Sequence, residues 1–341
     1  MSSPISKPRI LVCSNLKLFE SFFPLPYQER LSQISDWERL PSRKIDGALR
    51  RKLREADALI TTWDSPPFFS DALLDWAPQL RMIGHCGGEV KRRFARPLFE
   101  RLTVTNAPAP MARHVAELAV TFLLYFAREV DQYRDALRQP SNKIYEEMHL
   151  TGGGEQTVLG KTVGLIGLGR IGRAVVELLA PFGTRFLVFD PYVVPDDFKN
   201  YPLQFLPLEE VLKSSCFLVV AAALTGETQG LLNRQRLSLL PSGAVVINVA
   251  RGGLVDLDAL TKMVLRGRLR CALDVTDPVE PLPLRHPLRR AQGAILTPHV
   301  GSISRAVRLE MAAIVITDLE RFFQGKPVLN RVATEMLDRM T

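Results

Sequence analysis

The glycine-rich segment GLGRIG at residues 167–172 constrains the fold of this chain more than any other feature. An apolar run at 162–166 precedes it and has the composition of a buried parallel strand, and apolar residues then recur at helical spacing over 174–179. A second apolar run, 186–189, ends at Asp190, close to the spacing of about 20 residues that links such a loop to its acid. This order of strand, glycine turn, helix, strand and acid predicts a dinucleotide-binding unit, whereas the glycine pattern alone would indicate only a turn.

Asp190 bears on which dinucleotide is bound. A carboxylate at this position accepts hydrogen bonds from the ribose hydroxyls and repels a 2′-phosphate. The alternative is a turn or capping role, because Pro191 follows directly. Arg185 precedes the strand and is poorly placed to hold a 2′-phosphate. We therefore expect NAD rather than NADP as the cofactor.

The composition is typical of a soluble protein, and the length is sufficient for two domains. It has 341 residues, of which 46% are hydrophobic and 23% charged. The N-terminus lacks the apolar core of a signal peptide, and the apolar run 118–127 is too short to cross a bilayer. The cysteines are scattered without a CxxC pair, which argues against a disulfide framework or a zinc site: Cys13, Cys86, Cys216 and Cys271. We expect a cytoplasmic protein that binds no metal and no membrane.

The net charge of +8 raises the question of a nucleic-acid partner. Basic residues crowd two segments, 43–54 and 91–101. The first segment and its border also carry Asp46 and Glu55, and no aromatic residues are interleaved in that segment. No nucleic-acid-binding motif is present. We expect solvated basic faces with a general attraction for anionic ligands, and no nucleic-acid partner.

Strand and helix patterns alternate along nearly the whole chain, which predicts an α/β protein. Apolar runs predict four strands in the first part and six in the second, and helical spacing predicts one long amphipathic helix between the two parts. The expected strands are 9–14, 58–61, 80–83, 102–105, 162–166, 186–189, 217–222, 244–249, 271–275 and 294–297. The expected helices are 46–55, 71–76, 111–137, 234–239, 258–266 and 304–323.

Three polar residues follow successive strands of the second part: Arg251, Glu280 and His299. Ligands of such sheets bind beyond the carboxyl ends of the strands. Hydride exchange between a nicotinamide and a ketone needs a proton donor, which histidine can provide, and a neighbouring carboxylate would favour its protonated form. Arginine offers a planar fork for a carboxylate. Each residue alone fits an ordinary turn, loop or cap, but three successive strand ends beside a nucleotide motif indicate catalysis.

Four segments resemble the signatures of the NAD-dependent D-2-hydroxyacid dehydrogenase family. They are GLGRIG at 167–172, NVARGGLVD at 248–256, ALDVTDPVEPLP at 272–283 and TPHVG at 297–301. The resemblance extends over nearly the whole chain, including VAE at 115–117. It implies a Rossmann-type doubly wound sheet inserted into a smaller, flavodoxin-like substrate domain. The implied boundaries are 1–106 for the first part of the substrate domain, 107–300 for the NAD-binding domain and 301–341 for the returning segment.

The resemblance also implies roles for single residues. Arg251 would anchor the substrate, His299 would be the acid/base, and Glu280 would be the partner of His299. Asp274 would bind the nicotinamide carboxamide. The remaining cofactor contacts would come from Gly167, Gly169, Arg170, Ile171, Gly172, Asp190, Thr225, Asn248, Val249, Ala250 and Gly301. Family members are typically homodimers joined through the cofactor domain, and they use no catalytic metal.

The chain departs from the family in its expected substrate pocket. Members commonly carry a Gly-x-Gly loop followed by Asp, whose amides hold the substrate carboxylate, but this chain has HCGGEVK at 85–91. Gly87 and Gly88 are the expected counterparts, while Ala109 and Met111 replace a usual Gly and Asn. Our hypothesis is a 2-keto acid with an unusual side chain rather than simple pyruvate or phosphoglycerate.

Two other functions stay open at this point. A phosphite-type dehydrogenase uses the same scaffold, whereas formate dehydrogenases usually carry Gln where Glu280 stands. A corepressor-like branch of the family binds NAD(H) and acts through protein partners, but this chain lacks the long disordered tail or added domain expected there.

Overall fold

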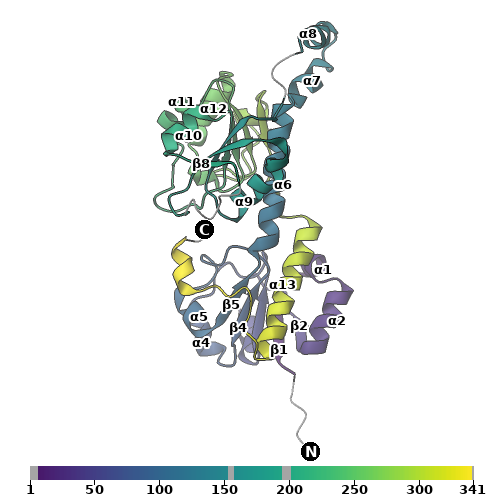
Figure 1. Cartoon of the computed structure of the whole chain (residues 1–341). Coiled ribbons are helices and arrows are strands. Elements are labelled where there is room, and N and C mark those ends of the chain that lie inside the picture. Colours follow the sequence, from purple (N-terminus) through teal and green to yellow (C-terminus); the bar gives the residue numbers. More distant parts are fainter. Residues whose placement is uncertain (1–6, 153–156, 194–200, 340–341) are drawn as a thin grey trace, which may run out of the picture. The chain divides into compact units, whose positions relative to one another are not determined.

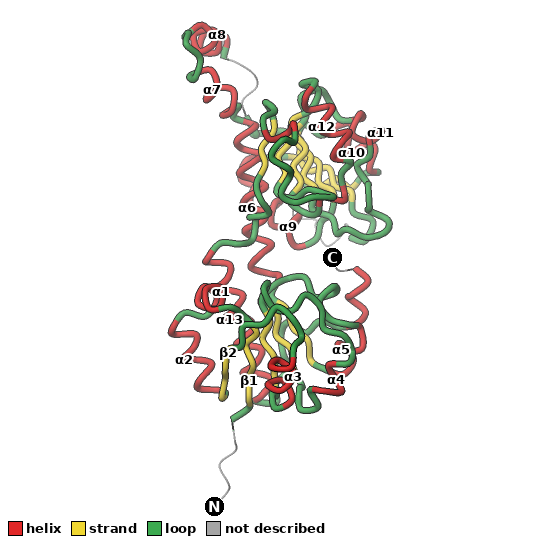
Figure 2. The backbone as a smooth tube through the Cα atoms, turned by 180° about the vertical axis from the view of Figure 1, so that it is seen from behind, coloured by secondary structure: helices red, strands yellow, loops and turns green. Residues whose placement is uncertain are grey.

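The computed structural model describes residues 7–152, 157–193 and 201–339, and the chain divides into two units (Figure 1). Unit 1 comprises residues 1–111 and 303–341, and unit 2 comprises residues 112–302. Each unit has one central parallel sheet with helices on both faces (Figure 2). The expected fold class, two α/β units with parallel sheets, is therefore confirmed.

Unit 1 has the strand order β2-β1-β3-β4-β5, which is the flavodoxin-like order. Its strands are β1 (Arg9–Cys13), β2 (Asp36–Arg39), β3 (Ala58–Thr61), β4 (Met82–His85) and β5 (Thr103–Asn106). One face packs on α1 (Leu16–Phe22), α2 (Leu25–Ile34) and α13 (Arg305–Phe323). The other packs on α3 (Gly47–Arg54), α4 (Leu73–Trp76) and α5 (Arg96–Arg101). The three central strands are buried on both faces, which explains their continuous apolar sequences.

Unit 2 has the strand order β12-β11-β10-β9-β6-β7-β8, the doubly wound order of a dinucleotide-binding sheet with one added strand. Its strands are β6 (Thr162–Ile166), β7 (Arg185–Phe189), β8 (Leu203–Phe205), β9 (Phe217–Val220), β10 (Val245–Asn248), β11 (Arg270–Leu273) and β12 (Ala294–Leu296). Helices α6 (Pro108–Ala127) and α9 (Arg170–Leu179) cover one face. Helices α10 (Leu208–Ser214), α11 (Arg234–Leu239) and α12 (Leu257–Leu265) cover the other. Strands β6 and β9 are parallel neighbours, and the order in which successive strands are added to the sheet reverses between them, which places the expected ligand site at their carboxyl ends.

The prediction of one long helix over 111–137 is wrong in one respect. Helix α6 ends at Ala127, and a separate helix α7 spans Val130–Ala136. Glu129 between them has a φ of 50°, in the left-handed region, so the helical hydrogen bonding is interrupted. Helices α1, α2, α5, α8 (Lys143–Thr151) and α10 were not predicted (Figure 1).

Two strands were also missed, and both lie at sheet edges. Strand β2 has the polar sequence DWER, and β8 has only three residues. The other expected strands and helices are present, with ends shifted by a few residues. Among the residues that the structure describes, no helix is long and apolar enough to cross a membrane.

Candidate active site

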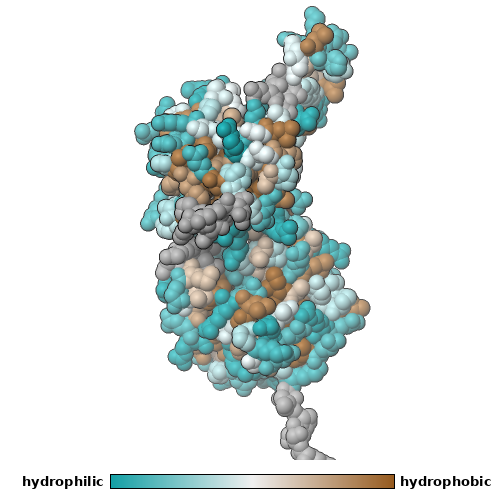
Figure 3. Space-filling model, in the orientation of Figure 1, coloured by the Kyte–Doolittle hydropathy of each residue, from teal (hydrophilic) through white to brown (hydrophobic). Residues whose placement is uncertain are grey.

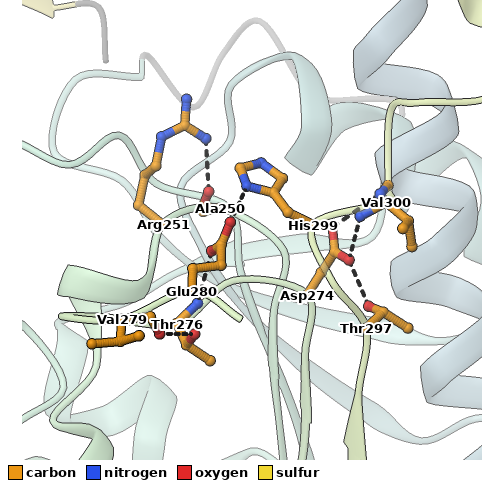
Figure 4. Close-up of polar contacts among 10 residues, drawn as sticks. Ala250, Arg251, Asp274, Thr276, Val279, Glu280, Thr297, His299 and Val300 are labelled. Carbon is orange, nitrogen blue, oxygen red and sulfur yellow. Dashed lines mark hydrogen bonds and ion pairs between the residues drawn. The ribbon is translucent and has the colours of Figure 1, made fainter. Parts of the chain in front are cut away.

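The side chains of His299 and Glu280 are paired at the carboxyl edge of the unit 2 sheet (Figure 4). His299 Nδ1 and Glu280 Oε1 lie 2.6 Å apart, and the side chains are 47% and 32% exposed. The second oxygen of Glu280 accepts a hydrogen bond from the Thr276 amide at 3.1 Å. The carboxylate is therefore held in place by its own loop while it engages one ring nitrogen of the histidine. The other nitrogen, Nε2, is the one left to exchange a proton with a ligand.

Buried Asp274 shapes the loop that carries His299. Its Oδ1 accepts hydrogen bonds from Thr297 Oγ1 at 2.5 Å and the Val300 amide at 2.8 Å, and its Oδ2 accepts from the Gly301 amide at 3.0 Å. The His299 amide donates to the Asp274 carbonyl at 2.8 Å. His299 has a φ of 56°, a costly conformation for a residue with a side chain, and these bonds hold it there.

Arg251 follows β10 and lies beside the histidine–glutamate pair (Figure 4). Asn248 closes the turn before it: its amide nitrogen donates to the Arg251 carbonyl at 2.9 Å, and its oxygen accepts from the Ala250 amide at 3.1 Å. A Cβ on Gly252 would lie 2.2 Å from the Thr276 carbonyl carbon. Glycine at this position therefore lets the loops after β10 and β11 touch, which brings the arginine next to the loop that carries Glu280.

The glycine loop has the geometry that a dinucleotide requires. Gly167 has a φ of 91°, and its Cβ would lie 2.7 Å from the Ala222 backbone, while a Cβ on Gly172 would lie 2.3 Å from the Gly167 carbonyl oxygen. These two glycines are needed for the turn and for helix packing. A Cβ on Gly169 would meet no atom within 4 Å, so this glycine leaves open space above the loop. That space is where the motif lets a pyrophosphate approach the backbone.

The N-terminus of α9 fits the same anionic group. Its N-cap residue, Gly169, provides no side-chain cap, and the first turn contains no acid. The first amides of this ten-residue helix and its dipole are thus suited to a pyrophosphate. Asp190 lies beside the loop, and its carboxylate accepts hydrogen bonds from the Leu168 amide at 2.7 Å and the Tyr192 amide at 2.9 Å. Thr225 lies in the turn after the neighbouring strand β9. Its amide donates a hydrogen bond to Thr228 Oγ1 at 2.7 Å, which holds this turn at the same edge of the sheet.

Gly87 and Gly88 lie in unit 1, in the loop after β4. The Gly87 carbonyl accepts from the Ala107 amide at 2.9 Å, and the Gly88 carbonyl accepts from Asn106 Nδ2 at 2.6 Å. A Cβ on Gly87 would lie 2.4 Å from the ring of His85. Asn106 was not singled out from the sequence, although an asparagine that ends an apolar strand is a recognisable signal for a loop anchor.

His85 is fully buried beside this loop. Its Nδ1 lies 2.9 Å from Thr61 Oγ1. Burial, helped by the nearby charge of Arg93, lowers the pKa of His85 from 6.5 to about 3. The ring is therefore neutral at physiological pH and supports the loop as a packed, hydrogen-bonded group rather than as a charge.

The doubly wound sheet, its glycine loop and the polar set at its strand ends define the class of nicotinamide-dependent oxidoreductases. Residues 120–301 match the family described as D-isomer specific 2-hydroxyacid dehydrogenase, NAD binding domain. The chain belongs to this family.

Related proteins agree with that assignment. The chain is 33% identical to a glyoxylate reductase of Pyrococcus horikoshii over 288 residues, which cover 82% of this chain and 83% of that protein. It is 34% identical to the human glyoxylate reductase/hydroxypyruvate reductase over 242 residues, or 70% of each chain. The solved structure of TT0316 protein from Thermus thermophilus is 32% identical, with a TM-score of 0.76 and coverage of 95% of this chain and 100% of that one. The protein is thus an NAD-dependent oxidoreductase that interconverts D-2-hydroxy acids and 2-keto acids.

Proposed function

We propose that Arg251, Glu280 and His299 carry out this reaction, and that unit 2 is the cofactor domain and unit 1 the substrate domain. The observation that carries the proposal is the 2.6 Å bond between His299 Nδ1 and Glu280 Oε1, with Arg251 beside it (Figure 4). A histidine held by a carboxylate at one nitrogen and free to act at the other is the usual arrangement of a general acid/base.

The proposed mechanism assigns each side chain one task. When bound, NADH supplies the hydride and NAD⁺ accepts it. Arg251 binds the substrate carboxylate and polarises the adjacent carbonyl through its planar guanidinium. Protonated His299 donates the Nε2 proton to the carbonyl oxygen as negative charge develops there, and takes a proton back in the oxidative direction. Glu280 orients the ring through its bond to Nδ1.

We further propose that the glycine loop and the N-terminus of α9 hold the cofactor pyrophosphate, with Arg170 and Ile171 beside it. Asp190 would bind the adenosine ribose, while Thr225 and the 248–250 backbone would line the site. Asp274 would contact the nicotinamide carboxamide, and Gly301 would lie next to it. Support comes from the open space at Gly169 and from the position of these residues at neighbouring strand ends.

For the substrate, we propose a 2-keto acid, with the loop of Gly87 and Gly88 as its binding segment in unit 1 and with Arg251 as its binding residue in unit 2. The relatives are named as glyoxylate and hydroxypyruvate reductases. The altered loop 85–91 favours an acid with a larger or differently charged side chain. Neither a phosphite dehydrogenase nor a corepressor-like sensor is favoured by these relatives.

Replacement of the proposed acid/base tests this function. His299→Ala is expected to lower kcat by about 100-fold or more, the contribution typical of general acid–base catalysis. The affinity for NADH, measured by fluorescence titration, should remain close to wild type. Preserved turnover in this variant would exclude the proposed role of His299.

We also propose a homodimer joined through unit 2, with the α7–α8 arm in the interface. Helix α8 has no buried residue, and its exposed side chains include Ile144, Tyr145 and Leu150, which are 48%, 45% and 84% exposed. Figure 3 shows hydrophobic residues interspersed with hydrophilic ones at the end of this arm. Ile144→Asp is expected to yield a monomer in light-scattering chromatography, whereas Lys143→Asp on the same helix should leave the dimer intact. A wild-type monomer would exclude this proposal.

We place the protein in the cytoplasm. All four cysteines are free, and three of them are buried: Cys13, Cys86 and Cys271. Free thiols support a reducing compartment. Fractionation of cells that express the native chain tests this location, and recovery in a secreted fraction would contradict it.

A further inference from the structure

Arg93 is a half-buried cation next to the glycine loop of unit 1. Its Nη1 lies 3.5 Å from the Thr62 carbonyl oxygen and its Nη2 lies 3.4 Å from the Trp63 carbonyl oxygen, both at the long limit of a hydrogen bond. In the described part of the chain, no carboxylate lies within 4.0 Å of this guanidinium. Its charge also acts on the ring of His85, which packs against Gly87. The guanidinium is thus close to the loop where we place the substrate carboxylate.

The nearest acids do not neutralise Arg93 by direct contact. Glu89 and Asp64 influence it only at longer range. Asp64 is engaged elsewhere, because its carboxylate accepts hydrogen bonds from Ser14, from the backbone and side chain of Asn15, and from Thr62. These bonds tie together the loops after β1 and β3, at the point where the strand order of unit 1 reverses. This is the position where sheets of this type bind ligands.

A second guanidinium adjoins the same loop. The side chain of Arg308, in α13, lies over the ring of Trp63 with its Cζ 5.0 Å from the ring centroid. Its Nη1 donates to Ser21 Oγ at 3.0 Å, while its Nε is buried without a hydrogen-bond partner among the described residues. Two arginines therefore contact Trp63, one at its carbonyl and one at its ring, and both add positive potential to this edge of the sheet.

Holding Arg93 in this position costs free energy in the absence of an anion. Burial lowers the pKa of Arg93, because the charged form loses hydration that two long bonds to carbonyl oxygens do not replace. A planar guanidinium in such a site matches a carboxylate or phosphate with paired oxygens. An anionic ligand would restore the missing interactions.

We propose that Arg93 selects the substrate side chain by binding a second anionic group, a carboxylate or a phosphate, at the end of the 2-keto acid distant from its own carboxylate. This inference rests on the proposed function and names the substrate class. Gly87 and Gly88 hold the first carboxylate, and Arg93 holds the second charge. A 2-keto acid with a neutral side chain leaves Arg93 without its partner and is a poorer substrate.

Matched pairs of 2-keto acids test the proposal by steady-state oxidation of NADH. The pairs are oxaloacetate with 2-oxobutanoate, 2-oxoglutarate with 2-oxopentanoate, and 3-phosphohydroxypyruvate with hydroxypyruvate. In the wild type, kcat/KM is expected to be higher for the anionic member of at least one pair. Arg93→Gln should lower that value by about 10- to 100-fold, as for loss of a charged hydrogen bond, and change the neutral member by less than about threefold. A higher kcat/KM for the anionic acid in the third pair would identify the second anionic group as a phosphate. A higher kcat/KM for the anionic acid in either of the first two pairs would identify it as a carboxylate.

Two controls separate charge recognition from other effects. Arg92→Gln removes the same charge from the exposed neighbour and should leave both members of each pair unchanged. The neutral acid provides an internal check that Arg93→Gln is folded. Preference for the neutral member in all three pairs, or an equal loss on both members in Arg93→Gln, would overturn the inference while the proposed function stands. Absence of turnover with every acid would overturn both.

Discussion

His299 Nδ1 lies 2.6 Å from Glu280 Oε1, and the two residues belong to loops that follow the adjacent strands β11 and β12. The bond depends on Asp274, which fixes the backbone of the histidine loop, and on the Thr276 amide, which fixes the carboxylate. The pair is therefore held in place by hydrogen bonds from residues at the sheet edge. Such preorganisation is what a general acid/base requires, because its geometry need not be formed during the reaction.

Glu280→Gln tests the electrostatic part of this pair. The amide can still bond to Nδ1 but carries no charge, so the reaction loses the negative charge beside the ring. We expect kcat to fall by about 10- to 100-fold, part of the full contribution of acid–base catalysis, with the Kd for NADH unchanged. Steady-state kinetics and a fluorescence titration measure the two quantities. An unchanged kcat would show that the carboxylate has no role in the reaction.

The three glycines of the loop make a matched comparison possible. Gly169→Ala adds a methyl group where no atom lies within 4 Å, so the Tm should stay at the wild-type value. The same methyl group fills the space proposed for the pyrophosphate, and the affinity for NADH should fall by about tenfold or more. Gly172→Ala places a Cβ 2.3 Å from a carbonyl oxygen and should lower both Tm and affinity. Wild-type affinity in Gly169→Ala would contradict the proposed position of the cofactor.

Asp190→Asn tests cofactor choice. The asparagine oxygen can keep one of the two backbone bonds now made to Leu168 and Tyr192, while the negative charge is lost. We expect the ratio of kcat/KM for NADH over NADPH to drop by about tenfold, because the repulsion of a 2′-phosphate is removed. Parallel assays with both cofactors give this ratio. A ratio equal to that of the wild type would assign Asp190 only to the turn.

Because His85 is buried, we expect the stability of unit 1 to decrease in acid. Above pH 6.5 the ring is neutral in the folded and unfolded states; between pH 6.5 and about 3 only the unfolded chain binds a proton. The free energy of unfolding should therefore decrease as pH falls, by up to about 1.4 kcal/mol per pH unit from this group.

Urea unfolding at pH values of about 7.5, 6 and 5, which span the onset of this proton uptake, measures the effect. The three tryptophans, Trp37, Trp63 and Trp76, all lie in unit 1, so their fluorescence reports on that unit. His85→Asn lacks the titrating ring and should show a shallower dependence on pH than the wild type. Parallel curves for the two proteins would mean that His85 is not the group responsible.

Most of the strands and helices could be predicted because their burial leaves a clear pattern. Strands β6, β9 and β10 are buried on both faces and read as continuous apolar runs. The edge strand β2 alternates exposed and half-buried side chains in a sequence rich in charge, which lacks that pattern. Helix α8 has no buried face, so no apolar periodicity marks it. The break at Glu129 arises from its backbone conformation and leaves no sequence pattern, because Val130 and Tyr133 continue the helical spacing beyond it.

Some features of the candidate site could likewise be predicted from the sequence, and others could not. Arg251, Glu280 and His299 could be predicted because each follows a strand, and strand ends meet at one edge of a parallel sheet. The support that Asp274 and Thr297 give to the histidine loop depends on side-chain geometry and has no sequence pattern. The half-buried state of Arg93 likewise arises from carbonyl groups of another loop, and the sequence places it only within a basic segment.

We propose that Arg251 and its neighbours reduce a 2-keto acid with NADH. The most direct measurement is the loss of nicotinamide absorbance with a panel of 2-keto acids, for wild type and Arg251→Ala side by side. We expect the wild type to consume NADH with a preferred acid, and the variant to lose at least about 100-fold in kcat/KM while it still binds NADH. NADH binding without turnover of any acid, or wild-type turnover by the variant, would contradict the account.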